Sequence, residues 1–86
     1  MAAKPIRFSV HALGYMERRG FSREDVEKAM RTCPWEKAER DRKECHLEIP
    51  FCEYWNGHEY AFRQIRPIFV EERSEIVVIT VYVYYY

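Results

Sequence analysis

The spacing of apolar residues changes its period once along this chain, near Trp35. Before that point the period is helical. Ser9 is suited to cap a first helix over residues 10 to 19, and Gly20 is suited to end it in the left-handed conformation. The expected apolar stripe of this helix consists of Val10, Leu13 and Met16.

A second helix is predicted to begin directly after the first. Ser22 can cap it, and Asp25 three residues later can complete a capping box. Pro34 ends the helix near residue 32, because the residue before proline is pushed out of helical geometry. The expected buried side, at the i, i+3, i+4 spacing, consists of Val26, Ala29 and Met30. The two helices therefore form a hairpin with a short corner at residues 20 and 21.

After Trp35 the period is two, which predicts strands. A short strand is expected over residues 35 to 39, followed by a polar turn. A second strand carries Pro50, which lacks a backbone donor and therefore predicts an edge strand or a bulge. Asn56-Gly57 predicts a type I′ hairpin turn, and the returning strand covers residues 60 to 68.

The last strand, residues 76 to 84, has an aliphatic and a polar-aromatic face. The aliphatic face consists of Val77, Ile79, Val81 and Val83. The other face consists of Thr80, Tyr82, Tyr84 and Tyr86. We therefore expect a single α+β domain over residues 1–86, with two N-terminal helices on one face of a small, mostly antiparallel sheet of three to four strands. The tyrosine row lines the uncovered face.

Composition narrows the class of protein. Fourteen Lys and Arg balance fourteen Asp and Glu, so net charge gives no argument for nucleic acid, although residues 1–31 carry seven basic against four acidic residues. No apolar run has the length of a membrane span and no signal-peptide core is present, which predicts a cytoplasmic protein without membrane contact. The three cysteines fit free thiols better than a disulfide framework.

Metal and cofactor motifs are weak. Cys45, His46, Cys52 and His58 invite a zinc interpretation, but their spacing lacks any CxxC or HxxxH pair. No phosphate-binding or dinucleotide fingerprint and no acidic cluster for magnesium occurs, so we expect no cofactor and no metal. Any phosphate chemistry is then expected to be metal-free.

Metal-free RNA cleavage needs a base for the 2′-hydroxyl, a cation for the charge on phosphorus and an acid for the leaving oxygen. His11 titrates near neutrality and suits proton transfer, while Tyr82 or Tyr84 could exchange a proton or stack on a base. The arginines that could clamp phosphate are Arg18, Arg19, Arg63 and Arg66. Simpler interpretations stay open: a histidine bonded at a helix start, solvated arginines, and an aromatic face that pairs with a protein.

Two segments resemble the small DUF4258 family, whose members typically read H-A-x-x-R-M-x-x-R-G-I-S-x-x-x-V and end in an I-T-V-Y-like strand. The matching residues are His11, Ala12, Met16, Arg19, Gly20, Ser22, Val26, Ile79, Thr80, Val81 and Tyr82. The resemblance implies a fold similar to RelE/ParE-like ribonuclease toxins, with the sheet face as RNA platform. It also implies that His11, Arg19, Thr80 and Tyr82 are site residues. The family's usual arginine four residues after the histidine is Tyr15 here, so a cation is either lost or supplied by Arg18.

Two functions from different classes follow. The first is a toxin-type, metal-independent endoribonuclease in which His11, Arg19 and Tyr82 are catalytic. The residues expected to bind its substrate are Arg18, Arg63, Arg66, Thr80 and Tyr84. The second is a non-catalytic module whose tyrosine face binds a protein partner or forms a homodimer. The expected partners are accordingly RNA, an antitoxin or other protein, or a second copy of the chain.

Overall fold

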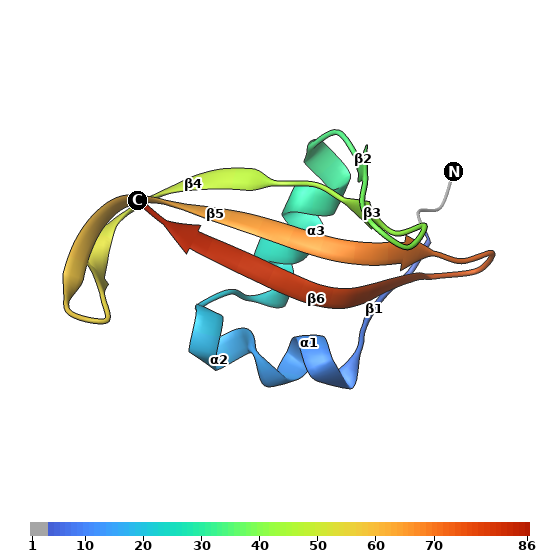
Figure 1. Cartoon of the computed structure of the whole chain (residues 1–86), viewed down its shortest axis with the longest axis horizontal. Coiled ribbons are helices and arrows are strands. Elements are labelled where there is room, and N and C mark those ends of the chain that lie inside the picture. Colours follow the sequence, from blue (N-terminus) through green and yellow to red (C-terminus); the bar gives the residue numbers. More distant parts are fainter. Residues whose placement is uncertain (1–3) are drawn as a thin grey trace.

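The computed structural model describes residues 4–86 (Figure 1). Its elements in chain order are β1 (Ile6–Phe8), α1 (Val10–Gly14), α2 (Met16–Arg19), α3 (Arg23–Thr32), β2 (Glu36–Lys37), β3 (Lys43–Glu44), β4 (Leu47–Trp55), β5 (His58–Glu71) and β6 (Ile76–Tyr85). No helix in this part of the chain is long and apolar enough to cross a membrane.

The strands form one mixed sheet of six strands, in the order β1-β6-β5-β3-β2 with β4 also paired to β5. The expected antiparallel sheet of three to four strands is therefore wrong. The parallel strand β1 pairs with residues 76 to 78 of β6, and every other pairing is antiparallel. Strands of two or three residues such as β1, β2 and β3 carry too few positions to display a period, and a parallel pairing between chain ends has no local signal.

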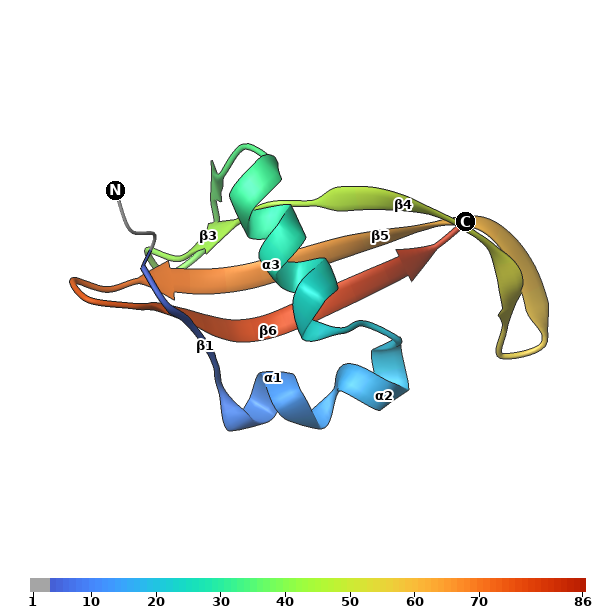
Figure 2. The same ribbon diagram turned by 180° about the vertical axis from the view of Figure 1, so that it is seen from behind.

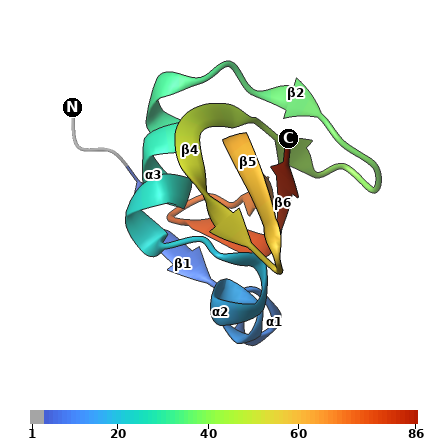
Figure 3. The ribbon, with the colours of Figure 1, turned by 90° about the vertical axis from the view of Figure 1, so that its left-hand side faces the viewer.

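The helices do not share one face of the sheet, which is a second correction. Helix α3 crosses one face, as Figure 2 shows, whereas α1 and α2 lie beyond the outer edge of β6 in both views (Figures 1 and 2). Seen end-on, α3 and the β2–β3 hairpin lie on opposite sides of the sheet (Figure 3). Within the described residues 4–86, the sheet face opposite α3, called the open face below, carries no helix.

The first predicted helix is broken at Tyr15 into α1 and α2. The Ser9 hydroxyl accepts from the Ala12 amide as predicted, and it also donates to the carbonyl of Ile79 in β6. Of the expected apolar stripe only Met16 packs against the core, whereas Val10 is 87% and Leu13 37% exposed. The side that packs against the core consists of Ala12, Tyr15 and Met16.

The aliphatic face of β6 also differs from the prediction. Ile68 pairs with Thr80 while Phe69 pairs with Val78, so Ile79 is an extra residue at a bulge. A bulge adds one residue to a strand, so the side chains on one side of it lie on the face opposite to the one that regular alternation would give them. Val81 and Val83 are therefore on the core side as predicted, whereas before the bulge the core side chains are Ile76 and Val78 in place of Val77 and Ile79.

Other local predictions are confirmed. Ser22 and Asp25 form the reciprocal capping box of α3, and the buried side of α3 is the predicted one. Asn56 and Gly57 both have positive φ in the β4–β5 turn, and the register shifts directly after Pro50. Tyr82, Tyr84 and Tyr86 are exposed, as the predicted alternation requires.

The cysteines are free thiols, and they differ in environment. Burial raises the pKa of the Cys45 thiol to about 12, so it stays protonated and packs as a small apolar side chain. Cys33 is half-buried and Cys52 is exposed.

Gly20 ends α2 with φ at 75° and lies against the β4–β5 hairpin and β6. A Cβ at this position would meet the Tyr85 hydroxyl and would lie 2.9 Å from Cη2 of Trp55. Gly57 has a similar φ of 84°, but a Cβ there would have no atom within 4 Å. The two glycines therefore separate the effect of backbone conformation from the effect of close packing.

We predict that Gly57→Ala lowers the free energy of unfolding by about 1–2 kcal/mol, the usual penalty of the left-handed conformation. Gly20→Ala should lose about 1–3 kcal/mol more, because the added methyl group overpacks the site. Urea denaturation of both variants measures the difference. Equal losses would show that the ring and hydroxyl beside Gly20 move away without cost.

Candidate nucleic-acid interface

Arg19, the last residue of α2, reaches around the outer edge of β6. Its Nη1 donates to the Val81 carbonyl at 2.8 Å and to the Thr80 hydroxyl at 3.3 Å. Phe62 and Tyr86 exchange both backbone hydrogen bonds, and such pairs alternate with non-hydrogen-bonded pairs along an antiparallel ladder. By this alternation Val81 is in a non-hydrogen-bonded pair, so its carbonyl points away from β5. The arginine thus extends from the strand edge to the open face.

Aromatic rings hold the Arg19 guanidinium on both sides. Its carbon lies 3.9 Å from the centre of the Tyr15 ring and 5.1 Å from that of Tyr82. The His11 ring meets Tyr15 edge-on, with centroids 4.8 Å apart, and is exposed. We name the set His11, Tyr15, Arg19, Thr80 and Tyr82 the arginine cluster. It brings together a titratable ring and a fixed cation, the two kinds of group that phosphate chemistry needs.

A row of exposed rings continues from the arginine cluster along the open face. Tyr82, Tyr84 and Tyr86 are 42%, 48% and 50% exposed. Tyr82 stacks on Tyr84 with centroids 6.5 Å apart, and Phe62 stacks on Tyr86 at 5.7 Å. We call these four side chains the aromatic ladder. Successive exposed rings are the usual platform for the bases of a single strand.

The two predicted arginines of β5 lie on opposite faces of the sheet. Arg66 is on the open face, with its guanidinium carbon 5.8 Å from the centre of the Tyr84 ring. Its buried Nε has no hydrogen-bond partner among residues 4–86. Arg18 is exposed beside Tyr15, 5.9 Å from the ring centre. Both are therefore placed near the arginine cluster or the aromatic ladder.

Arg63 is on the core side of β5. Its Nη1 donates to the Gly20 carbonyl at 2.6 Å, and its Nη2 forms an ion pair with Asp25 at 3.2 Å. Successive side chains of a strand point to opposite faces, so residues 63 and 66, three positions apart, lie on different faces of the sheet. Arg63 stabilises the corner between α2 and α3, away from the surface that carries the other predicted site residues.

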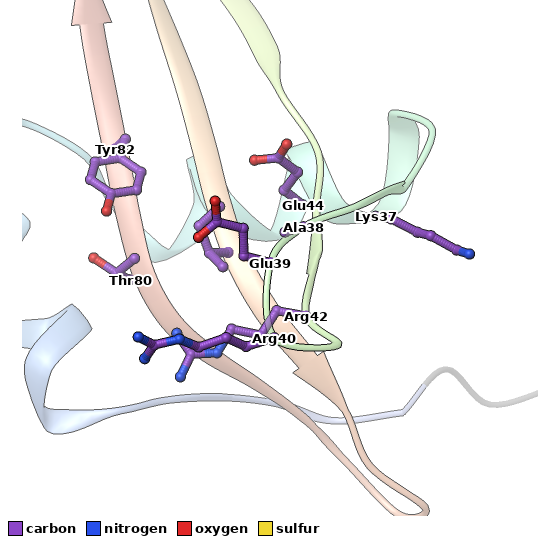
Figure 4. Close-up of a pocket in the computed structure, with 9 residues that line it drawn as sticks. Lys37, Ala38, Glu39, Arg40, Arg42, Glu44, Thr80 and Tyr82 are labelled. Carbon is purple, nitrogen blue, oxygen red and sulfur yellow. The ribbon is translucent and has the colours of Figure 1, made fainter.

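A pocket adjoins the arginine cluster. The loop between β2 and β3 lies over the open face and borders an open pocket of about 600 Å³ (Figure 4). Thr80, Tyr82 and Ile68 line its sheet side. The other lining residues come from the hairpin and are Lys37, Ala38, Glu39, Arg40, Arg42 and Glu44.

The sequence interpretation missed Arg40 and Arg42. Residues 41 to 43 were expected to be a polar turn, which describes the local structure but gives no tertiary position. The one available signal was the density of charge, since every residue from 39 to 44 is charged. That pattern is ordinarily a solvated turn, so only the position of the loop over the sheet distinguishes it.

A protein-family model described as "Domain of unknown function (DUF4258)" matches residues 8–83. The chain belongs to this family. No curated protein and no solved structure matches it. The matched range of this DUF4258 chain runs from β1 into β6 and includes the whole arginine cluster.

Tyr15 has a defined position in this DUF4258 chain, where the sequence left two interpretations open. Its ring lies between the predicted His11 and Arg19 and contacts both. Arg18 also lies beside this ring. A tyrosine at this position therefore holds Arg19 against the sheet, and Arg18 is the nearest additional cation.

Between residues 4 and 86, no three His, Cys, Asp or Glu side chains are grouped closely enough to hold a metal ion. Of the four residues weighed for zinc, Cys45 is buried while His46, Cys52 and His58 are exposed.

Near the end of the aromatic ladder, burial raises the pKa of Tyr86, and the neighbouring Glu48 adds to this effect.

Replacing Arg63 tests whether it is structural. We predict that Arg63→Met lowers the free energy of unfolding by about 1–3 kcal/mol, because it removes charge-assisted bonds to a carbonyl and a carboxylate. Arg31→Met is the matched control: it breaks an exposed i,i+4 pair with Glu27, worth about 0.3–0.5 kcal/mol. Urea denaturation measures both. If the two variants are equally stable, Arg63 does not stabilise the corner.

Proposed function

We propose that this chain is a metal-independent endoribonuclease of toxin type that binds single-stranded RNA on its open face. The observation that supports the proposal most is the arginine cluster, in which His11 and Arg19 contact the same ring beside an aromatic platform. An antitoxin protein is then the expected physiological partner.

In the proposed reaction, the RNA 2′-hydroxyl attacks the adjacent phosphorus and the 5′-oxygen of the next nucleotide leaves. His11 takes the proton of the 2′-hydroxyl and then gives it to the leaving 5′-oxygen, as its exposure on α1 allows. Arg19 stabilises the charge on the phosphoryl oxygens, since only its Nη1 is engaged by other described residues. The products are a 2′,3′-cyclic phosphate and a 5′-hydroxyl.

Tyr82 and Tyr84 are proposed to stack on the bases that flank the cleaved bond. Tyr82 is within the arginine cluster, so a stacked base would bring its phosphate near Arg19. Arg66 beside Tyr84, Arg18 beside Tyr15 and the hydroxyl of Thr80 are the remaining polar groups of this surface. Arg63 is not part of the proposal, because its guanidinium is bonded on the core side.

We predict that the purified protein cleaves a single-stranded RNA in the presence of EDTA and that His11→Ala slows cleavage at least about 100-fold. His58→Ala, which removes an exposed histidine from the β4–β5 hairpin, should leave the rate unchanged. Gel analysis of a 5′-labelled oligonucleotide measures both the rate and the cyclic-phosphate end. A substrate with 2′-deoxyribose at the cleaved position should resist.

If His11→Ala cleaves at the unaltered rate, His11 has no part in the reaction. A product with a 5′-phosphate would contradict attack by the 2′-hydroxyl and would therefore refute the mechanism.

A second candidate is a protein-binding or dimerisation module. It is favoured by the exposed aromatic ladder and by the outer edge of β6, where β1 pairs only with residues 76 to 78. The backbone N–H and C=O of Val83 point away from β5, because Val83, like Val81, is in a non-hydrogen-bonded pair of the ladder. An exposed strand edge beside an apolar surface is a common site for adding a strand from another chain.

Sedimentation equilibrium separates the two candidates. If the ladder is a dimer surface, the wild type should have the mass of two chains, and Tyr84→Ser should have the mass of one. The endoribonuclease proposal instead predicts that the wild type is monomeric with the ladder free. A dimer that Tyr84→Ser leaves intact would show that some other surface joins the chains.

A further inference from the structure

The β2–β3 loop, which lies over a pocket on the open face, has no role in the reaction described above. This pocket lies beside the arginine cluster and shares Thr80 and Tyr82 with it. Its remaining polar residues, from a different part of the chain, are three cationic and two anionic side chains: Lys37, Arg40, Arg42, Glu39 and Glu44. The pocket thus combines an aromatic floor with both kinds of charge.

The loop holds Arg40 and the next residue, Asp41, in an unusual backbone conformation. Arg40 and Asp41 have φ of 60° and 58°, in the left-handed region that favours Asn or Gly. The Arg42 amide donates to the Glu39 carbonyl at 3.2 Å and the Ala38 amide to the Arg42 carbonyl at 2.8 Å, so the turn is closed. Residues kept in such conformations occur often at binding sites, because the strain must be offset elsewhere.

Figure 4 shows the direction of these side chains. Those of Arg40 and Arg42 extend together from the loop toward β6, near Thr80, while Glu39 lies between them and Tyr82. Neither arginine forms an ion pair within residues 4–86. Two neighbouring guanidinium groups without a carboxylate partner are suited to a phosphate, whose oxygens accept several donors at once.

The remaining groups suit a base. The Tyr82 ring is 42% exposed and can stack on a planar heterocycle. Carboxylates only accept hydrogen bonds, so Glu39 and Glu44 favour a base edge that presents adjacent N–H donors, as guanine does. A cavity of about 600 Å³ lies within the range of small-ligand sites and accommodates one nucleotide.

We propose that this pocket binds one nucleotide of the RNA strand next to the cleaved bond, with its phosphate on Arg40 and Arg42 and its base on Tyr82. The inference rests on the proposed function for the identity of the ligand. Guanine is the preferred base, because Glu39 or Glu44 can accept from its N1–H and N2–H groups together. The strand then runs from the aromatic ladder, over Tyr82, to the β2–β3 loop.

Binding is tested separately from cleavage with a fully 2′-O-methylated, fluorescein-labelled heptamer, which lacks the attacking hydroxyl. Arg40→Gln/Arg42→Gln should weaken its binding at least about 10-fold in fluorescence anisotropy. It should also reduce the slope of log K against log salt by about 0.7, the value for one neutralised phosphate on a single strand. The substitution should leave the fold of the loop unchanged, because glutamine has a Cβ at the positive-φ position just as arginine does.

Lys28→Gln/Arg31→Gln is the matched control, since it removes two charges from exposed positions of α3 on the other side of the sheet. Its affinity should equal that of the wild type. Arg40→Lys/Arg42→Lys keeps both charges and should restore the salt slope. A heptamer with one central guanosine among uridines should bind about 5–10-fold more tightly than the all-uridine heptamer.

The possible outcomes separate this inference from the proposed function. If Arg40→Gln/Arg42→Gln binds the heptamer with unaltered affinity and salt slope, the pocket assignment is overturned even where unmodified RNA is still cleaved. If the variant binds weakly as expected but the wild type cleaves no RNA, the pocket assignment stands and the endoribonuclease proposal fails. Equal affinity for the two heptamers would overturn the guanine preference.

Discussion

The corner between α2 and α3 is the constraint on which the candidate site depends. The Arg63 guanidinium donates to the Gly20 carbonyl at 2.6 Å, and the Tyr85 hydroxyl donates to the Arg19 carbonyl at 2.7 Å. Two neighbouring carbonyls at the end of a helix are thus bonded from β5 and from β6. Because the backbone of Arg19 is fixed by these bonds, its side chain can reach around the strand edge in one direction.

Burial around the corner strengthens this arrangement. Tyr85 stacks on Trp55 with centroids 5.0 Å apart, and burial raises the pKa of its hydroxyl, so Tyr85 remains a hydrogen-bond donor at any physiological pH. Gly20 leaves room for both side chains. The corner, the β4–β5 hairpin and the end of β6 therefore form one packed unit. The surface that carries Arg19 is as rigid as that unit, which preorganised electrostatic stabilisation requires.

The open face gathers short segments from distant parts of the chain. Helix α1 contributes His11, and β6 contributes Thr80, Tyr82 and Tyr84. The β2–β3 loop contributes Arg40 and Arg42. These segments meet because α3 covers the opposite face alone, which leaves β5 and β6 uncovered between the helices and the loop (Figures 2 and 3). A neutral chain can in this way present a local concentration of arginines, although its net charge is zero.

The sequence by itself determined the features that depend on neighbouring residues: the Ser22–Asp25 capping box, the left-handed Gly20, the Asn56-Gly57 turn and the bulge after Pro50. It also placed Tyr82, Tyr84 and Tyr86 on one face. Only the tertiary structure decided the parallel pairing of β1, the bulge at Ile79 and the position of the β2–β3 loop. These depend on contacts between residues far apart in the chain, and no local period or propensity encodes such contacts.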